Sequence, residues 1–219
     1  WVERRRRNGA PNRSIGRGRS GNGTIMIAIV DIGVGNLGAI KNMLRKVGAQ
    51  AMITAQPDEI RQADKIVLPG VGAFDQGMRA LADSGLMDVL NEQALEKKRP
   101  VLGICLGAQM LGRKSEEGEL PGLGWIDMDV VRFPRKEGLR VPHMGWNTVT
   151  PVLHDGTVHP LFAGHDANPR FYFVHSYHFA CDDESDVAST CEYGTAFAAA
   201  VARGNIWGVQ FHPEKSHRF

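Results

Sequence analysis

The chain switches between two spacings of its hydrophobic residues. Short apolar runs predict buried strands, whereas segments in which apolar residues recur every three or four positions predict amphipathic helices. In the first half we predict strands at residues 25–30, 51–54, 65–68 and 101–104, and helices at 37–47, from 57, and across 75–98 with a break near Gly85. Because strands alternate with helices, these elements predict right-handed βαβ units and a parallel sheet.

The second half of the chain has a different texture. After residue 122 the apolar runs are short and strand-like, and we predict strands at 125–133, 170–174, 177–181, 196–201 and 206–211. No internal repeat is present. We therefore expect one α/β domain, with a mostly parallel sheet flanked by helices and an added β-rich region in its second half.

Composition supports a single globular domain. The chain has 219 residues, of which 42% are hydrophobic, and this is enough for one well-buried core. No apolar run reaches the ~20 residues that span a bilayer, and the N-terminus lacks the apolar core of a secretory signal. We expect a cytoplasmic protein that does not contact a membrane.

The net charge is unevenly distributed. Residues 1–23 contain seven arginines and one acidic residue, Glu3, which gives this segment a charge of +6; since the whole chain carries +2, residues 24–219 carry −4. A segment rich in Gly, Arg, Asn and Ser cannot bury enough apolar surface to fold. We expect residues 1–25 to be a disordered extension, or sequence upstream of a native start at Met26, rather than a nucleic-acid contact.

Residues 33–38 match the G-x-G-x-x-G pattern of dinucleotide-binding sites, between a predicted strand and a predicted helix. Such a site also needs an acidic residue at the end of the second strand, about 20 residues later. Residues 54–56 occupy that end and are Thr, Ala and Gln, whereas the acidic residues 58–59 begin the next helix. We therefore expect these glycines to allow a tight turn where the backbone approaches a neighbouring loop.

Cys105 is the strongest candidate for chemistry. Gly103-Ile104-Cys105-Leu106-Gly107 follows a predicted strand and precedes a helical pattern that begins near Ala108. This is the arrangement of a nucleophile elbow, in which small residues flank the nucleophile because the sharp turn leaves no room for side chains. The turn lifts the sulfur toward the carboxyl edge of the sheet, where open α/β folds bind ligands. Amides at the start of the following helix favour a thiolate, which is the reactive species.

A thiol nucleophile requires a base, and His212 stands at the end of another predicted strand. Glu214 follows two residues later, and in an extended segment residues i and i+2 project to the same side. Its carboxylate would fix the imidazole tautomer and support the imidazolium. A His-x-Glu pair alone is equally consistent with a surface pair, but together with the elbow it predicts a triad of Cys105, His212 and Glu214.

The loop at residues 69–72 provides a second candidate for stabilising negative charge. Pro69-Gly70-Val71-Gly72 follows a predicted strand, and its two glycines let backbone N–H groups face a developing oxyanion, as the amide of Leu106 also would. The alternative is that this loop is only a tight turn. The remaining cysteines, Cys181 and Cys191, lack the paired short spacing of a disulfide framework or zinc site, and we expect them to be core thiols.

Several segments resemble the signatures of class I glutamine amidotransferases. These segments are residues 103–109, 69–74 and 210–216. Residues 31–44, Pro142-His143-Met144-Gly145-Trp146-Asn147 and Phe173-Val174-His175-Ser176-Tyr177 more narrowly resemble the glutaminase subunits of imidazole glycerol phosphate synthases. The resemblance extends from about Met26 to Ser216, and it implies the flavodoxin-like fold of class I glutamine amidotransferases.

The resemblance implies that the chain releases ammonia from glutamine, with Cys105 as the nucleophile and His212 as the proton donor. The amides around the oxyanion would be those of Val71, Gly72 and Leu106. The residues implied to contact glutamine or line its pocket are Gly72, Gln109, Glu117, Tyr172, His175 and Ser176. The resemblance implies no metal and no organic cofactor in this subunit.

The same resemblance implies a heterodimer with a cyclase subunit, a (β/α)8 barrel. The cyclase would use the ammonia to make imidazole glycerol phosphate and aminoimidazole carboxamide ribotide in histidine biosynthesis. The residues implied to face this partner are His143, Met144, Gly145, Trp146 and Asn147.

The sequence departs from the family pattern at both ends. Residues 1–25 have no counterpart in the family, and the chain stops at Phe219, so we expect the domain at 26–219 to lack the final helix of family members. Two alternative functions remain. One is the glutaminase of another pathway, such as pyridoxal phosphate, GMP or anthranilate synthesis, and the other is an inactive subunit that regulates a synthase.

Overall fold

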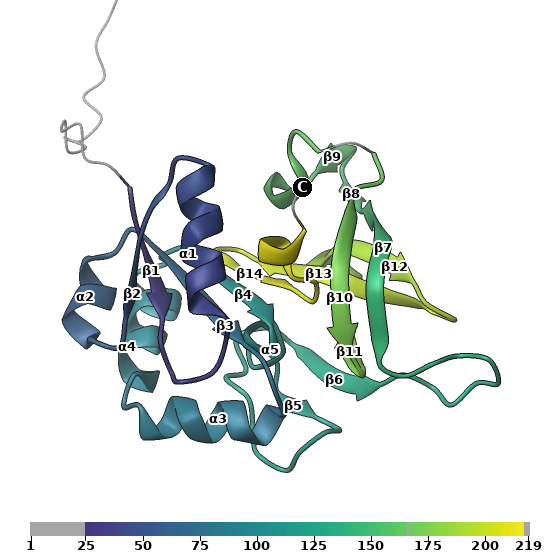
Figure 1. Cartoon of the computed structure of the whole chain (residues 1–219), viewed down its shortest axis with the longest axis horizontal. Helices are drawn as coiled ribbons and strands as arrows, with labels where there is room; N and C mark the ends of the chain where they lie inside the picture. Colours follow the sequence, from purple (N-terminus) through teal and green to yellow (C-terminus); the bar gives the residue numbers. More distant parts are fainter. Residues whose placement is uncertain (1–24, 166, 217–219) are drawn as a thin grey trace, which may run out of the picture.

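The computed structural model describes residues 25–165 and 167–216. The first half combines strands with helices, and the second half consists mainly of strands, as the sequence predicts (Figure 1). Except for residue 25, the segment predicted to be a disordered extension lies outside the described residues. The predicted absence of a final helix concerns the chain after Ser216, which also lies outside them.

Five parallel strands form the centre of the first half. They are β1 (Met26–Val30), β2 (Gln50–Thr54), β3 (Lys65–Gly70), β4 (Val101–Cys105) and β14 (Ile206–Val209). Their spatial order is β2-β1-β3-β4-β14, so the last strand of the chain returns to the edge of the first half. This is the doubly wound order of flavodoxin-like folds, which bind ligands outside the carboxyl ends of the strands. The predicted parallel sheet is confirmed.

Helices cover both faces of this parallel part. They are α1 (Leu37–Lys46), α2 (Pro57–Gln62), α3 (Phe74–Asp83), α4 (Met87–Asn91) with the π-helical turn Glu92–Glu96, and the short α5 (Leu106–Gln109). The predicted break near Gly85 is confirmed, because this glycine has φ +68° between α3 and α4. No helix in the described part of the chain is long and apolar enough to cross a membrane.

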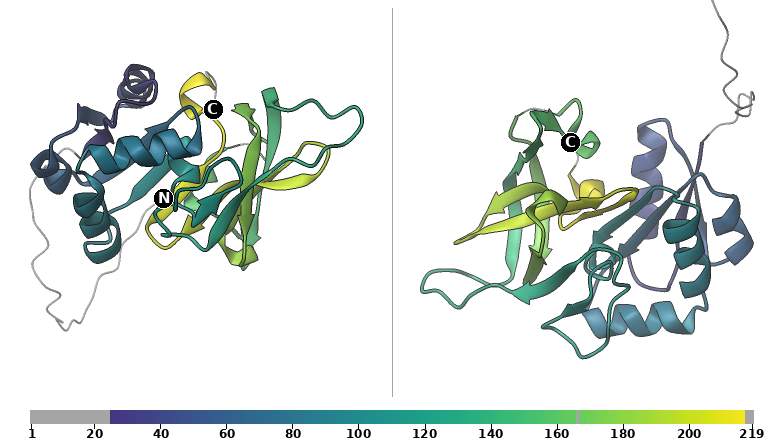
Figure 2. Two further views of the ribbon diagram at one scale, coloured as in Figure 1. Left: turned by 90° about the horizontal axis from the view of Figure 1, so that it is seen from below. Right: turned by 180° about the vertical axis from the view of Figure 1, so that it is seen from behind.

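Apart from three two-residue strands, the strands of the second half are antiparallel and continue the same sheet. The longer ones are β6 (Met128–Arg132), β7 (His143–Pro151), β10 (Arg170–His175), β11 (Tyr177–Cys181), β12 (Val187–Glu192) and β13 (Ala196–Arg203). Shorter elements are β5 (Lys114–Ser115), β8 (Leu153–His154), β9 (Thr157–Val158) and the 3-10 turns Pro160–Phe162, Glu184–Asp186 and Pro213–Lys215. Figure 2 shows these strands standing beside the helix-covered half.

Two of these strands, β7 and β12, are missing from the sequence prediction. Strand β7 contains Gly145, Asn147 and Pro151, which are poor strand formers. It is extended because it pairs with β10 on one side and β12 on the other. Tertiary pairing therefore overrides the weak local preference, and it places the predicted partner-facing segment on a strand.

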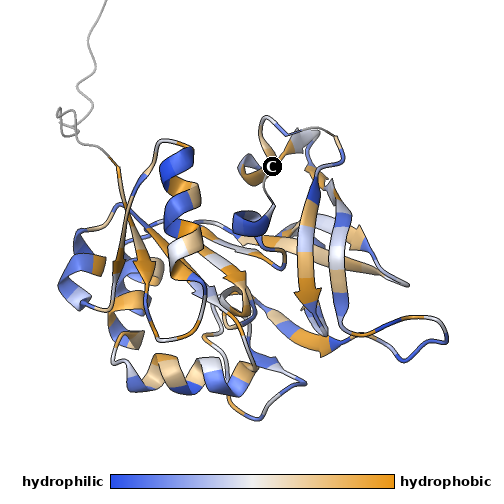
Figure 3. Ribbon diagram, in the orientation of Figure 1, coloured by the Kyte–Doolittle hydropathy of each residue, from blue (hydrophilic) through white to orange (hydrophobic). Residues whose placement is uncertain are grey.

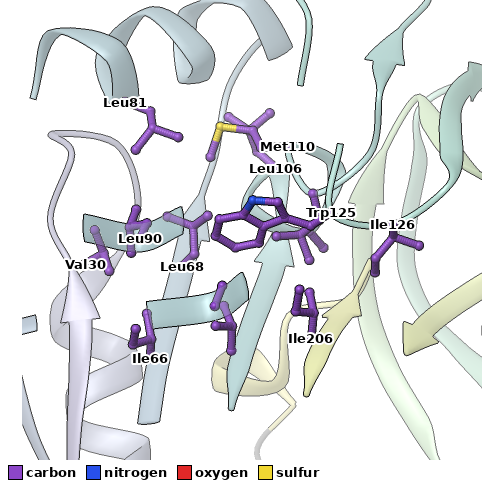
Figure 4. Close-up of a cluster of buried hydrophobic side chains, with 14 of the residues drawn as sticks. Val30, Ile66, Leu68, Leu81, Leu90, Leu106, Met110, Trp125, Ile126 and Ile206 are labelled. Carbon is purple, nitrogen blue, oxygen red and sulfur yellow. The ribbon is translucent and has the colours of Figure 1, made fainter. Parts of the chain in front are cut away.

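The core consists of one hydrophobic cluster on each face of the parallel sheet. Val30 and Leu68 point toward α2, α3 and α4, whereas their neighbours Ile29 and Val67 point toward Ile40 of α1. Figure 4 shows side chains from several strands and helices converging in the first cluster. In Figure 3 the central strands are mostly apolar, while α1 and α3 carry polar residues on their outer sides. Both clusters hold the carboxyl ends of β3 and β4 rigidly in place.

Candidate active site

Cys105 is the last residue of β4, and α5 begins at the next residue. Its backbone has φ +53° and ψ −112°, a conformation that L-residues with a side chain rarely adopt. Such strain is found at nucleophile elbows and persists only where the surroundings enforce it. The predicted elbow is confirmed. The helix starts two residues earlier than we predicted and contains only four residues.

The two glycines of the elbow are required by close backbone packing. A Cβ atom at Gly103 would lie 2.6 Å from the Cα of Ala108, in the turn that follows. A Cβ at Gly107 would overlap the carbonyl oxygen of Leu68 on the neighbouring strand β3. Both obstacles are backbone atoms, which cannot rotate away. The strand-to-helix turn is therefore pressed against β3 and can form only with glycine at these positions.

His212 and Glu214 lie beside the elbow, as the sequence predicts. The Nδ1 atom of His212 donates a hydrogen bond to Oε1 of Glu214 at 2.8 Å, and both side chains are buried. The predicted extended conformation is wrong, because Pro213–Lys215 forms a 3-10 turn with His212 as its N-cap. The turn still brings the two side chains together. Nδ1 is occupied by Glu214. Among the described residues, Nε2 has no hydrogen-bond partner, but the ring interacts electrostatically with Cys105.

The electrostatic environment favours a protonated His212. Burial by itself lowers the pKa of the imidazole, but interactions with the Cys105 sulfur and with the hydrogen-bonded Glu214 carboxylate raise it to about 9. The imidazolium is therefore the form of His212 that this arrangement stabilises. The ring can therefore hold a proton next to the sulfur and deliver it to a leaving group.

We expect Cys105→Ala to lower the pKa of His212 from about 9. The substitution removes the interaction of the ring with the sulfur, whereas the burial that lowers the pKa remains. Titration of the ring by NMR would measure the shift. His178, whose pKa is lowered mainly by burial, serves as the internal control and should titrate as before. An unchanged His212 pKa in Cys105→Ala would show that the sulfur does not interact with this ring.

A cavity of about 670 Å³ opens beside Cys105, at the carboxyl ends of the parallel strands. The predicted site residues among its lining are Val71, Gly72, Cys105, Leu106, Gln109, Glu117, His175, Ser176 and His212. The other lining residues are Gly35, Asn36, Pro142, Val174, Tyr177 and Lys215. The cavity thus brings together residues from both halves of the chain.

The loop after β3 lies next to the nucleophile because Gly70 pairs in register with Cys105. Gly72 has φ +102°, which favours glycine. Neither Val71 nor Gly72 donates its backbone N–H to another of the described residues. Two unused donors beside the sulfur are suited to bind a negatively charged oxygen, although their role as oxyanion donors stays a prediction.

Glu117 lines the cavity and also holds the loop structure around it. Its Oε2 atom accepts a hydrogen bond from the backbone N–H of Phe74, the first residue of α3, at 2.9 Å. The Asp75 carboxylate, near the start of α3, accepts hydrogen bonds from the backbone N–H groups of Glu119 and Leu120. These hydrogen bonds, with that from Leu120 contributing most, lower the pKa of Asp75. Residues 117–120 are therefore fixed against the start of α3.

The structure places the side chain of Tyr172 outside the residues that line the cavity. Its ring packs edge-on against Trp146 and lies 5.5 Å from the Nζ of Lys215. Its backbone has a clearer role, because the carbonyl accepts the N–H of His212 at 2.9 Å and its N–H donates to Ser216 Oγ at 3.1 Å. Tyr172 therefore positions His212, and its contact with substrate stays a prediction.

Gln210 is a site residue that the sequence prediction did not include. It is fully buried, and its Nε2 donates to the Sγ of Cys105 at 3.7 Å. Its Oε1 accepts a hydrogen bond from Nε2 of Gln109 at 3.0 Å. A polar residue inside the apolar run at 206–211 is unusual for a buried strand, and this was the available signal.

The predicted partner-facing segment divides into exposed and buried residues. Met144 and Trp146 are 62% and 42% exposed, whereas His143 is buried. Gly145 and Asn147 are half-buried between them. Exposed large apolar side chains on one strand are typical of interaction surfaces.

The glycine-rich loop before α1 packs against the site rather than presenting a nucleotide-binding surface. A Cβ at Gly35 would lie within 4 Å of Pro69 and Gly70. The side chain of Asn36 accepts the N–H of Ala39 at the start of α1. The close approach to a neighbouring loop agrees with the sequence prediction.

Comparison with known proteins shows which family the chain belongs to. Residues 28–219 match the family model of class-I glutamine amidotransferases. The chain belongs to this family. One relative is imidazole glycerol phosphate synthase subunit HisH 2 of Pseudomonas aeruginosa. It is 56% identical over 194 residues, and the match covers 89% of this chain and 94% of the relative. The subunit of the same name from Methanococcus maripaludis is 49% identical over 194 residues, with the same coverage of both chains.

Solved structures of glutamine amidotransferases share the fold. One crystal structure of a glutamine amidotransferase has a TM-score of 0.67 at 18% identity and covers 86% of this chain and 90% of its own. A glutamine amidotransferase from Thermotoga maritima has a TM-score of 0.62 at 20% identity, and the match covers 88% of this chain and 77% of that chain. These similarities extend across both the α/β half and the antiparallel strands.

Proposed function

We propose that this chain is the glutaminase subunit of an imidazole glycerol phosphate synthase. It hydrolyses glutamine to glutamate and ammonia, and the ammonia is delivered to a cyclase subunit. The cyclase produces imidazole glycerol phosphate and aminoimidazole carboxamide ribotide in histidine biosynthesis. The observation that carries this proposal is Cys105 in a strained elbow beside the His212–Glu214 pair, in a chain 56% identical to a subunit of that synthase.

The reaction begins when the Cys105 thiolate attacks the carboxamide carbon of glutamine. The carbonyl oxygen becomes an oxyanion, which the backbone N–H groups around Val71, Gly72 and Leu106 are placed to stabilise. Loss of one such donor typically raises a barrier by about 3 kcal/mol. The His212 imidazolium gives its proton to the departing nitrogen, so that ammonia leaves and a glutamyl thioester remains.

Hydrolysis of the thioester completes the cycle. Neutral His212 takes a proton from water, which attacks the thioester carbon, and glutamate leaves while the sulfur returns as a thiolate. The carboxylate of Glu214 supports this exchange because it keeps Nδ1 protonated and Nε2 directed away from itself. Gln109, Glu117, His175 and Ser176 line the volume where glutamine would lie.

The cyclase partner, a (β/α)8 barrel in our proposal, docks on the side of the cavity that carries β7. Met144 and Trp146 supply exposed apolar surface there, and Val71 of the predicted oxyanion loop is also 43% exposed. Burying such side chains favours association. A partner on this surface would receive ammonia without its release to solvent.

A glutaminase assay with and without the cyclase subunit tests this function. We expect low activity in the isolated chain and a rise of at least about tenfold, or 1.4 kcal/mol of barrier, when the cyclase and its ligand are added. Partner dependence is expected because the loop with Val71 and Gly72 is exposed at the docking surface and free hydrolysis would waste glutamine. Full activity of the isolated chain would contradict partner control. Absence of glutamine hydrolysis in the complex would contradict the function itself.

A further inference from the structure

Two buried histidines from neighbouring strands meet behind the cavity. His143 on β7 and His175 on β10 are paired in register, and His143 Nδ1 lies 2.9 Å from His175 Nε2. His175 lines the cavity, whereas His143 is not among its lining residues. The His143 ring is stacked between Phe173 and Tyr193, with ring centroids 4.7 and 3.9 Å away. These contacts fix the plane of the His143 ring.

The partners of the two rings determine the direction of each hydrogen bond. The carbonyl of Tyr177 can only accept, so His175 donates its Nδ1–H to it, at 2.8 Å. In a neutral ring Nε2 of His175 is then an acceptor, and His143 must donate its Nδ1–H to it. His143 Nε2 in turn accepts from Nδ2 of Asn147 at 3.3 Å. Burial keeps both rings neutral, since it lowers the pKa of His175 to about 3 and of His143 to about 4.

The same chain of hydrogen bonds continues to the nucleophile. The Tyr177 carbonyl also accepts from Nε2 of Gln109 at 3.4 Å, and this amide donates to Oε1 of Gln210 at 3.0 Å. Gln210 Nε2 then donates to the sulfur of Cys105 at 3.7 Å. A donor aimed at the sulfur stabilises the thiolate. Each amide is therefore held in the orientation that presents N–H to the next acceptor.

The end of these hydrogen bonds that lies farthest from Cys105 is Asn147, on the strand that carries the exposed apolar side chains. Asn147 follows Trp146 on β7, and its amide is fixed by donating to the carbonyl of Glu192 at 2.9 Å and accepting the N–H of Thr148 at 2.8 Å. A shift of β7 would move both Asn147 and His143. The hydrogen bonds thus join the strand that carries the proposed docking surface to the reacting sulfur.

We propose that His143 is a positioning residue: its Nδ1–H fixes His175 and, through the Tyr177 carbonyl, the Gln109 and Gln210 amides that hold the Cys105 sulfur. The position of β7 is thereby transmitted to the nucleophile. This inference rests on the proposed glutaminase function. It differs from a purely structural role, for which His143 would only fill space between Phe173 and Tyr193.

Two substitutions of His143 separate these roles. His143→Asn places an amide N–H where Nδ1 was, so the bond to His175 is kept and the one to Asn147 is lost. His143→Gln places its amide at the Nε2 position, so the bond to His175 is lost. In the complex with the cyclase subunit, we expect His143→Gln to lower kcat for glutamine about tenfold, the size of one hydrogen bond. His143→Asn should stay within about threefold of the unaltered complex.

The decrease in kcat should exceed any change in the KM for glutamine, because the hydrogen bonds end on the sulfur, even though His175 and Gln109 also line the proposed glutamine pocket. The 15N resonances of the ring provide a second readout. His175 should be protonated at Nδ1 in all three proteins, and its Nε2 should show the shift of a hydrogen-bonded acceptor except in His143→Gln. As a matched control, the same two substitutions should give equal kcat values at His178, which packs on Phe133 and Phe197 and hydrogen-bonds to the carbonyl of Phe179.

Several outcomes would overturn the inference. Equal kcat losses in His143→Asn and His143→Gln would show that His143 only fills space, and protonation of His175 at Nε2 would reverse the direction of the hydrogen bonds. The inference and the underlying function fail separately. A Cys105→Ala complex that loses glutamine-dependent activity, together with indistinguishable His143 variants, would retain the function and reject the positioning role.

Discussion

Cys105→Ala is expected to abolish glutamine-dependent product formation by the complex while ammonia-dependent synthesis continues. In the proposed mechanism no thioester can form without the sulfur, and the proposed oxyanion donors and His212 have no nucleophile to assist. Removal of the nucleophile from a comparable triad costs on the order of 10⁴-fold or more in rate. The cyclase subunit does not use Cys105, so external ammonia should replace glutamine. Parallel assays with glutamine and with an ammonium salt measure both activities.

The matched control for this prediction is Cys191→Ala, which removes a buried thiol from β12, away from the cavity lining. Burial raises the pKa of the Cys191 thiol to about 12, so that it is not a nucleophile at neutral pH. This variant should retain glutamine-dependent activity. Equal loss of both activities in Cys105→Ala would instead indicate a structural effect on the complex and would count against the assignment.

Gly107→Ala is expected to prevent folding of the domain or to destabilise it by more than about 3 kcal/mol. The added methyl group would overlap the backbone carbonyl of Leu68, inside a sheet whose neighbours cannot move aside. Relief would require separating β3 from the elbow, and this would break the packing of the whole carboxyl edge. Urea denaturation measures the change in the free energy of unfolding, and soluble yield reports a complete failure to fold.

Gly38→Ala is the matched control for this substitution. Gly38 lies in α1, and a Cβ there would meet no atom within 4 Å. Alanine favours a helix over glycine by about 1 kcal/mol, so this variant should be as stable as the parent or more stable. If Gly107→Ala were tolerated as well as Gly38→Ala, the strained elbow would not be the structure that the backbone adopts in solution.

The first half of the fold and the elbow around Cys105 could be predicted from sequence because their signals are local. The strands β1 to β4 are short apolar runs, and the break at Gly85 and the elbow glycines follow from backbone sterics over a few residues. His212 and Glu214 could be paired because they are two positions apart. The predicted conformation between them was wrong, since Pro213 begins a 3-10 turn that sequence spacing did not reveal.

The features that escaped prediction depend on residues far apart in the chain. Strands β7 and β12 form because they have partners in the sheet, and neither carries a strong strand pattern of its own. Gln210 reaches Gln109 across 101 positions, and His143 reaches His175 across 32. No local propensity encodes such pairs.

The sequence by itself therefore determined the parallel α/β half, the elbow around Cys105 and the closeness of His212 to Glu214, because steric and hydrophobic constraints act between neighbouring residues. Only the tertiary structure decided which buried polar groups meet the sulfur and which residues of β7 face solvent. Those outcomes depend on strand order and register, through which a buried polar group obtains the hydrogen-bond partners that it requires.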